Sequence, residues 1–273
     1  MIDVLIPHGP NDDRCLAECV RRAIAHVVGV RRVHVVSHDA EKARRLIAEN
    51  DIAGDIVAVH DEATPGLFPF DRRSVAALLP ADAVGRAGWY LQQLVKLYAG
   101  RCVPEINTDG GGFLVLDADV MLLRDLTFAP EEFHVGSEHH LPYFAHAARL
   151  LPWLVRADAR YSGVAHCMVM TAQRLEAILG EIEARSGGTA AWKAFLSAVD
   201  PAHAAASGAS EYEIYFNHAL LRPLETTRLR ARMPWVESTS VEAAVARWGA
   251  EIPDLAYVAV HAYVRAQGEE NAQ

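Results

Sequence analysis

The sequence lacks any long apolar run and any recognisable export signal. Although 51% of the residues are hydrophobic, no uninterrupted stretch approaches the roughly 18–20 apolar residues that a membrane-spanning helix requires. The first residues, MIDVLIPHGPNDD, have neither the basic start nor the small-residue cleavage site of a secretory signal. We therefore expect a cytoplasmic protein without a transmembrane segment.

Cysteine is also scarce, and its spacing argues against a disulfide framework. The 4 cysteines, Cys15, Cys19, Cys102 and Cys167, form no C-x-x-C pair. A chain of 273 residues can bury enough apolar surface to fold without disulfides. We expect all of these side chains to be reduced thiols.

Three common nucleotide-binding and hydrolase motifs are missing. The sequence contains no G-x-x-x-x-G-K-[ST] phosphate loop and no G-x-S-x-G nucleophile elbow. The early PHGPNDD lacks the G-x-G-x-x-G of a dinucleotide-binding fold, and the GGG at 110–112 precedes a strand instead of opening a helix. These absences argue against kinases, serine hydrolases and dehydrogenases.

Positive charge is in deficit. The chain has 26 Lys and Arg against 35 Asp and Glu, which gives a formal net charge of −9. Nucleic-acid phosphates are normally bound by clustered Lys and Arg, so nucleic acid is not the expected default partner. An acidic protein that binds an anionic nucleotide needs a local positive group, such as a metal ion.

Apolar runs and helical patterns alternate from the N-terminus. Residues 2–6 predict a strand that Pro7 ends, and strands are also predicted at Val33–Ser37 and at 56–59, with helices between them. Alternating strands and helices favour an α/β fold with a mostly parallel, doubly wound central sheet flanked by helices. The length is compatible with a single domain.

The middle of the chain leads to an acidic motif. Segment 60–85 is rich in proline and predicts loops, and 88–98 predicts a helix. The apolar residues 113–116 predict a strand that runs directly into Asp117-Ala118-Asp119. Ligands of open α/β sheets gather at the carboxyl ends of strands, so these aspartates are well placed for chemistry.

The remaining elements are less regular. The pattern predicts strands near 133–137, 164–170 and 257–264. It predicts helices over 172–185 and 211–221, with Ser210 as the N-cap of the second helix. Residues 186–209 predict a loop that is interrupted by a short helix in WKAFL, and residues 266–273 predict a disordered tail.

Asp117 and Asp119 are the central candidates for metal binding. In an extended segment, residues two apart point the same way, so both carboxylates can project from one side. Two such carboxylates can hold a hard divalent cation that bridges a diphosphate. The alternative is that they are ordinary loop acids at a strand end, but their position directly after FLVL favours the metal site.

Several segments resemble a known family. FLVLDADVMLL resembles the strand and D-x-D motif of GT-A glycosyltransferases. The surroundings also resemble a bacterial group within that fold, described as a family of unknown function: RAGWYLQQLVKLYA, SGVAHCMVM and SEYEIYFNHALL. The resemblance spans most of residues 2–264. It implies a GT-A-like domain over 1–265, with a nucleotide-sugar half to about residue 125 and an acceptor half from about residue 126.

The resemblance implies a third metal ligand near the C-terminus. GT-A enzymes often complete their metal site with a late histidine, and His261 in YVAVHAYV is the matching candidate. A neutral imidazole at a strand position can join the coordination of a manganese or magnesium ion. Asp117 then contacts both the metal and the ribose, and Asp119 is the firmer metal ligand. A structural or surface role for His261 is the alternative.

Polar residues of the GWYLQQLVKLYA segment are candidates for donor binding. Gln92 and Lys96 are four residues apart and share a helical face. Arg86 or Lys96 can neutralise a diphosphate oxygen, and Gln93 lies beside them. The alternative is a solvated polar face with Trp89, Leu94 and Leu97 turned inward.

Glu211 is the preferred catalytic base, and Glu213 is the alternative. Inverting transfer needs a carboxylate that removes a proton from the acceptor hydroxyl. Both residues lie at a predicted helix start, where the helix dipole also favours acids for structural reasons. The other acceptor-side candidates are Glu138, His139, His140 and His166; the last could equally be a hydrogen-bonded core histidine.

Together these features predict a metal-dependent glycosyltransferase that uses a nucleoside-diphosphate sugar as donor and Mn²⁺ or Mg²⁺ as cofactor. Its acceptor would be a hydroxyl on a small molecule, a glycan or a cell-surface precursor. A nucleotidyltransferase also uses paired acids and a divalent ion, and a noncatalytic nucleotide-sugar-binding subunit is a third possibility. Residue spacing does not distinguish retention from inversion at the sugar.

Overall fold

The computed structural model describes residues 1–106, 110–224 and 226–264. The chain divides into two compact units, each built from separate stretches of sequence: unit 1 contains residues 1–61, 114–128 and 232–273, and unit 2 contains residues 62–113 and 129–231. The units do not follow the functional division near residue 125, which stays a prediction. The predicted tail at 266–273 lies outside the described residues.

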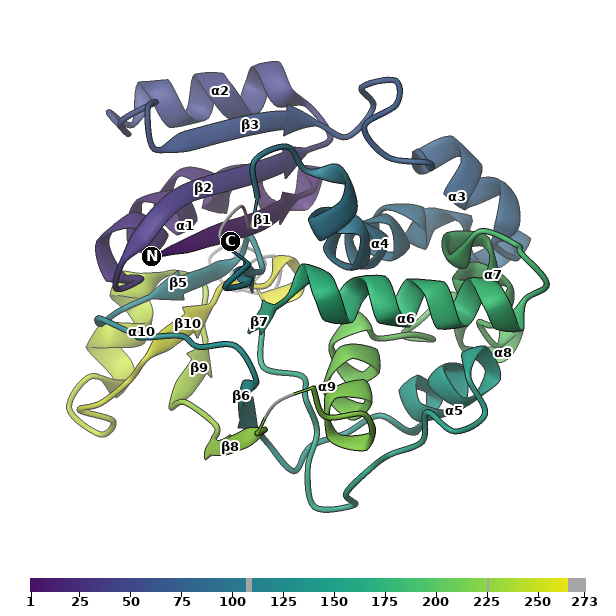
Figure 1. Ribbon diagram of the computed structural model, residues 1–273. Helices are drawn as coiled ribbons and strands as arrows, with labels where there is room; N and C mark the ends of the chain where they lie inside the picture. Colours follow the sequence, from purple (N-terminus) through teal and green to yellow (C-terminus); the bar gives the residue numbers. More distant parts are fainter. Residues whose placement is uncertain (107–109, 225, 265–273) are drawn as a thin grey trace. The chain divides into compact units, whose positions relative to one another are not determined.

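Unit 1 has an α/β architecture (Figure 1). Its strands are β1 (Ile2–His8), β2 (Val30–Ser37), β3 (Val57–Asp61), β4 (Phe113–Leu116, from its second residue), β5 (Val120–Leu122), β9 (Trp235–Glu237) and β10 (Tyr257–Ala259). Its helices are the short 3-10 helix η1 (Pro10–Asp12), α1 (Asp13–His26), α2 (Ala40–Glu49) and α10 (Val241–Trp248).

The larger sheet of unit 1 places β3, β2, β1 and β4 side by side in that order. The pairings of β1 with β2 and of β2 with β3 are both parallel, and helices α1 and α2 pack against these strands. Every residue of β4 is buried, as expected of a strand covered on both faces. The predicted α/β class with a mostly parallel sheet flanked by helices is therefore confirmed.

Two strand ends differ from the prediction. Pro7 does not end β1: it keeps the parallel register by pairing with Val36, and the strand continues to His8. A proline lacks only its own N–H donor, so the strand loses one hydrogen bond of the ladder and can still pair with a neighbouring strand. The second difference is the end of β10, which stops at Ala259 instead of reaching residue 264. Both strands that pair with β10, β5 and β9, are only three residues long. His261 therefore follows the strand and does not occupy a strand position.

Unit 2 is mainly helical (Figure 1). Its helices are α3 (Arg72–Leu78), the 3-10 helix η2 (Ala81–Arg86), α4 (Ala87–Cys102), α5 (Leu141–Leu150), α6 (Ala172–Arg185), α7 (Ala191–Ser197), α8 (Pro201–Ala204) and α9 (Glu211–Leu221); its strands are β6 (Glu132–Val135), β7 (Cys167–Met170) and β8 (Arg228–Ala231).

Two helices of unit 2 agree closely with the sequence prediction. Helices α6 and α9 have the predicted bounds, because Thr171 and Ser210 accept backbone N–H groups of the first turn and fix where each helix begins. The expected loop over 60–85 is only partly correct, since it contains α3 and η2. Segment 186–209 contains the helix expected in WKAFL, but also the short α8.

Two further expectations concern membrane insertion and thiols. Within the described ranges, no helix has the length and apolarity that crossing a bilayer requires. All 4 cysteines are thiols and not disulfide partners, as their spacing predicted.

His146 in α5 makes the stability of unit 2 depend on pH. Its side chain is fully buried, and Nε2 donates to the carbonyl of Phe195 at 2.9 Å. Burial lowers the pKa of His146 to about 4. The hydrogen bond to Phe195 raises the pKa by less than burial lowers it, and the charge of Arg149 lowers it slightly further. The folded pKa lies below the unfolded one, so this stabilisation is present above about pH 6.5 and is lost as the pH falls towards 4.

We expect the His146→Gln variant to lose this pH dependence. Between pH 6.5 and 4, the free energy of unfolding of the parent protein should fall by about 1.4 kcal/mol per pH unit more than that of the variant, because the parent's unfolded state binds one extra proton. Urea unfolding at several pH values measures this slope. The exposed His139 provides the control, and equal slopes for His146→Gln and the parent would contradict the assignment.

Candidate functional site

The Asp117-Ala118-Asp119 segment is a turn between β4 and β5. The N–H of Val120 donates to the carbonyl of Asp117 at 3.1 Å, and the N–H of Val260 donates to the carbonyl of Asp119 at 2.8 Å. The expectation of an extended segment, in which the two carboxylates point the same way by strand alternation, is therefore wrong. The turn nevertheless places both aspartates at the carboxyl end of the buried strand β4.

Asp119 and His261 form a close polar contact at this turn. The Nδ1 atom of His261 lies 2.7 Å from Oδ2 of Asp119, and both side chains are partly buried. The strand pairing of β5 with β10 brings together these residues, which are 142 positions apart. Among the described residues, Asp117 does not complete with them a group of three ligand atoms within 4.8 Å of one another.

The charges around His261 favour a cation. Burial lowers the pKa of this imidazole, but its hydrogen bond to Asp119 and the negative charges of Asp119, Glu237 and Asp117 outweigh burial, so that the pKa is raised. Oε1 of Glu237 lies 3.7 Å from Nε2 of His261 and also accepts from the hydroxyl of Tyr263 at 2.7 Å. Glu237 was missed in the sequence, because it ends a three-residue strand with no motif around it.

The Asp119 and His261 atoms fit a divalent ion. Two ligands at about 2.1 Å from a metal, at right angles, are about 3 Å apart, close to the 2.7 Å between these atoms. Carboxylate oxygens suit Mn²⁺ and Mg²⁺, and an imidazole is compatible with Mn²⁺. Asp119 and His261 would hold the ion, and Asp117 lies in the same turn as Asp119.

Cys19 of α1 makes a hydrogen bond to the turn. Its thiol donates to the carbonyl of Asp117 at 3.6 Å, and its side chain is fully buried. Burial, followed by the negative charge of Asp119, raises the pKa of the thiol well above its usual value. Cys19 is therefore a neutral packing and hydrogen-bonding group at neutral pH.

In unit 2, Lys96 and Glu211 form a buried ion pair. The Nζ atom of Lys96 lies 2.7 Å from Oε1 of Glu211, and both side chains are less than a tenth exposed. The ammonium group also lies 4.4 Å from the ring centre of Tyr212. The sequence predicted separate roles for these residues, phosphate binding for Lys96 and proton removal for Glu211. The structure instead joins them, so a change to either affects both.

The other polar residues of α4 differ in environment. The guanidinium of Arg86 stacks on Trp89 at 4.5 Å, and burial lowers its pKa. Gln92 is half-buried, whereas Gln93 is buried and neither atom of its amide has a hydrogen-bond partner among the described residues. The prediction of a donor-binding helix face is not tested by these contacts.

Glu213 is fully buried and surrounded by hydrogen-bond donors. Its carboxylate accepts from the hydroxyl of Ser162, from the N–H of Gly163 at 3.2 Å and from the amide of Asn217 at 3.0 Å. Burial raises the pKa of Glu213 despite these hydrogen bonds. Residue 163 must be glycine, because a Cβ there would lie 2.4 Å from the side chain of Phe216.

The remaining acceptor-side candidates lie on loops. Glu138, His139 and His140 are exposed and precede α5; His139 contacts the carbonyl of Ser137 at 3.0 Å. His166 lies immediately before β7 with φ of 57°, a left-handed conformation that is unusual for a residue other than glycine. Their common role in an acceptor pocket stays a prediction.

A comparison with protein-family models decides the family. Residues 25–242 match the model of DUF6492, described as a family of unknown function. The chain belongs to the DUF6492 family. The matched range contains the D-x-D turn, α4 and α9, but ends before β10 and His261. No curated protein matches the chain.

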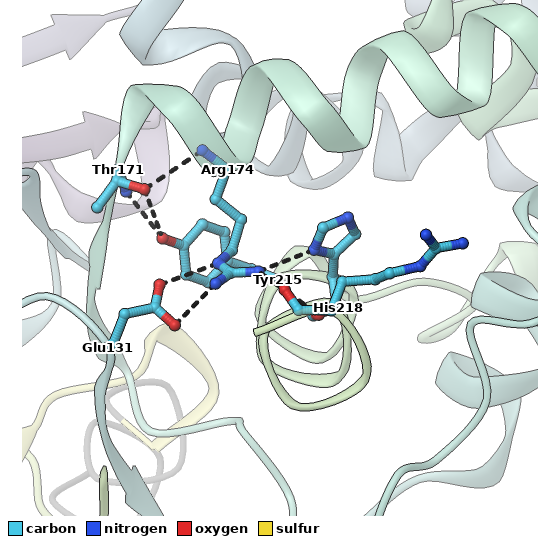
Figure 2. A network of polar contacts seen from close by, with 6 residues as sticks. Glu131, Thr171, Arg174, Tyr215 and His218 are labelled. Carbon is cyan, nitrogen blue, oxygen red and sulfur yellow. Dashed lines mark hydrogen bonds and ion pairs between the residues drawn. The ribbon is translucent and has the colours of Figure 1, made fainter. Parts of the chain in front are cut away.

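This DUF6492 protein also contains a buried charge network that the sequence did not reveal. The guanidinium of Arg174 makes a two-point contact with Glu131, at 3.0 and 2.8 Å. It also contacts Nδ1 of His218 at 3.0 Å and donates to the carbonyl of Arg222 at 2.9 Å. Figure 2 shows Arg174 of α6 between Glu131 and His218. Its partners lie more than forty positions away in sequence, so no local pattern predicts the network.

Proposed function

We propose that this DUF6492 protein is a metal-dependent glycosyltransferase that moves a sugar from a nucleoside-diphosphate donor to a hydroxyl acceptor. The observation that supports the proposal most directly is the contact between Asp119 and His261 at 2.7 Å. It joins a D-x-D turn at a strand end to a histidine near the C-terminus, which is the arrangement that the sequence resemblance implies.

The roles of the chain's own residues follow from this contact. Asp119 and His261 would hold the ion, and Asp117 would contact the ion or the donor's ribose. A bound Mn²⁺ or Mg²⁺ supplies positive charge that offsets the charge developing on the departing nucleoside diphosphate. His261 would release its proton when the ion binds, because a ligand nitrogen must present its lone pair.

Proton removal from the acceptor is assigned to Glu211, with Glu213 as the alternative. Glu211 would act with its partner Lys96, which lies 2.7 Å away. Burial raises the pKa of Glu213, which is the direction expected of a general base, but its carboxylate is enclosed by Ser162, Gly163 and Asn217. The conservative variants Glu211→Gln and Glu213→Gln separate these assignments, since loss of the base lowers kcat and changes the pH profile of the rate.

Donor binding should stabilise the protein only when metal is present. We expect the correct nucleoside-diphosphate sugar, at about 100 times its Kd, to stabilise the fold by about 2.7 kcal/mol. For a protein of this size that corresponds to a rise in Tm of roughly 5–10 °C. A thermal-shift screen of nucleotide-sugars with and without Mn²⁺ measures this effect, and the Asp119→Asn variant should show no metal-dependent rise.

Product analysis then distinguishes the competing functions. Release of a nucleoside diphosphate together with a glycosylated acceptor supports the proposal. Release of pyrophosphate from a nucleoside triphosphate would identify a nucleotidyltransferase instead. Donor binding without hydrolysis or transfer, across a broad panel of acceptors, would identify a noncatalytic binding subunit.

A further inference from the structure

A second group of possible metal ligands lies at the carboxyl ends of β1 and β2. His8 is the last residue of β1, His38 directly follows β2, and Asp13 opens α1. The parallel pairing of the two strands places His8 opposite Ser37, and the N–H of His38 donates to the carbonyl of His8 at 3.3 Å. One ligand atom from each side chain of His8, Asp13 and His38 lies within 4.8 Å of the other two.

The hydrogen bonds of Ser37 fix the tautomer of His8. The single hydroxyl hydrogen of Ser37 is donated to the carbonyl of Asp39 at 2.9 Å. Its contact with Nδ1 of His8, also at 2.9 Å, therefore has the imidazole as donor. With the hydrogen on Nδ1, a neutral His8 presents a lone pair on Nε2.

The lone pair of His8 faces a carboxylate oxygen. Nε2 of His8 lies 3.3 Å from Oδ1 of Asp13. The other carboxylate oxygen of Asp13 is already paired with Nζ of Lys42 at 2.6 Å. Two acceptors that face each other repel unless a cation or a proton lies between them. Nε2 of His8, Oδ1 of Asp13 and Nδ1 of His38 are all buried and have no hydrogen-bond partner among the described residues.

We propose that His8, Asp13 and His38 bind a divalent transition-metal ion, with Zn²⁺ as the best match. Two ligands at about 2.0–2.1 Å from a tetrahedral ion are about 3.3 Å apart, which equals the distance between Nε2 of His8 and Oδ1 of Asp13. Three protein ligands leave the fourth position for water, as in zinc sites that take part in chemistry. Ser37 acts as a positioning residue, because it orients the His8 ring.

The chemistry of this site differs from that of the D-x-D turn. Two imidazoles and one carboxylate suit Zn²⁺, whereas carboxylate-rich sites suit Mg²⁺ and Mn²⁺. Asp13 and His38 are partly exposed while His8 is buried, so an ion can enter from the solvent side and reach the buried nitrogen. The inference does not depend on the proposed sugar transfer, since none of its ligands belongs to the Asp119–His261 pair.

Metal titration of the full chain tests the site. The protein is freed of metal by a chelator and then titrated with Zn²⁺ against a chromophoric competitor, and with Co²⁺, whose visible absorption reports the ligands. We expect about one Zn²⁺ per chain at this site and no competition by millimolar Mg²⁺. The His38→Gln variant should bind Zn²⁺ with an affinity at least ~100-fold lower, because losing a metal ligand should exceed the 10–100-fold effect of losing a residue that only orients a ligand. Ser37→Ala should weaken binding by about 10-fold.

Two comparisons make the result decisive. His26→Gln removes a partly exposed histidine of the same unit that contacts Asp125, and it should bind Zn²⁺ as the parent does. The double variant Asp119→Asn/His261→Gln should retain the Zn²⁺ and the Co²⁺ spectrum if the ion sits on the proposed ligands. Loss of the spectrum in that double variant, its survival in His38→Gln, or the absence of Zn²⁺ binding by the parent would each overturn the proposal.

Discussion

An Asp119→Ala variant is expected to lose metal-dependent sugar transfer by at least ~100-fold while keeping its fold. Asp119 is the carboxylate that contacts His261, and without it the proposed ion loses a charged ligand. Metal stabilisation of a leaving group amounts to several kcal/mol, and each 1.4 kcal/mol corresponds to a factor of ten in rate. The fold should survive, because the hydrogen bond between Val260 and Asp119 uses the main-chain carbonyl.

Another aspartate–histidine pair provides a matched control. Asp125 contacts His26 at 3.1 Å in the same unit, and its side chain is 76% exposed. Asp125→Ala should leave both transfer and its dependence on Mn²⁺ unchanged. Rates are measured with the donor found in the thermal-shift screen, and urea unfolding checks each variant's stability. Full transfer by Asp119→Ala under these conditions would remove the basis of the proposed function.

Local signals in the sequence were sufficient for α6 and α9 but were overlooked for α3, which begins with a capping box at Asp71. Ser210 and Thr171 fix the beginnings of α9 and α6, because a hydroxyl that accepts from the first turn is specific to that position. Strand ends were less predictable, since they depend on partners elsewhere in the chain. Residues after Ala259 alternate as a strand should, but β5 and β9 offer no further residues with which to pair.

The sequence named Asp117, Asp119 and His261 as candidates, but it indicated neither their contacts nor Glu237. The apolar run before Asp117 indicated the strand end, and the family resemblance indicated His261. The pairing of Lys96 with Glu211 joins residues 115 positions apart and has no sequence signature. His8 and His38 had a usable signal: His8 ends an apolar strand and His38 directly follows one, and parallel strands bring such positions to the same edge.

Removing Arg174 is expected to destabilise unit 2 more than removing any exposed arginine. Arg174 is fully buried and Glu131 is only 4% exposed. The Arg174→Met variant leaves the Glu131 carboxylate buried without its partner and withdraws a donor from the carbonyl of Arg222. Breaking a buried ion pair by removing one partner costs about 3–5 kcal/mol, which for a chain of this size lowers Tm by roughly 10 °C.

The contrast with Arg101 isolates the effect of burial. Arg101 makes the same two-point contact with Glu176, at 2.9 and 2.7 Å, but the two side chains are 35% and 49% exposed. Because water can solvate the carboxylate that remains, Arg101→Met should cost at most about 1 kcal/mol. Urea unfolding followed by tryptophan fluorescence measures both, with Trp153 beside His218 as a local reporter. An equal loss in the free energy of unfolding for Arg174→Met and Arg101→Met would show that burial does not govern how much the Arg174–Glu131 pair stabilises the fold. The same conclusion would follow if Glu131→Gln lowered the free energy of unfolding as little as Arg101→Met.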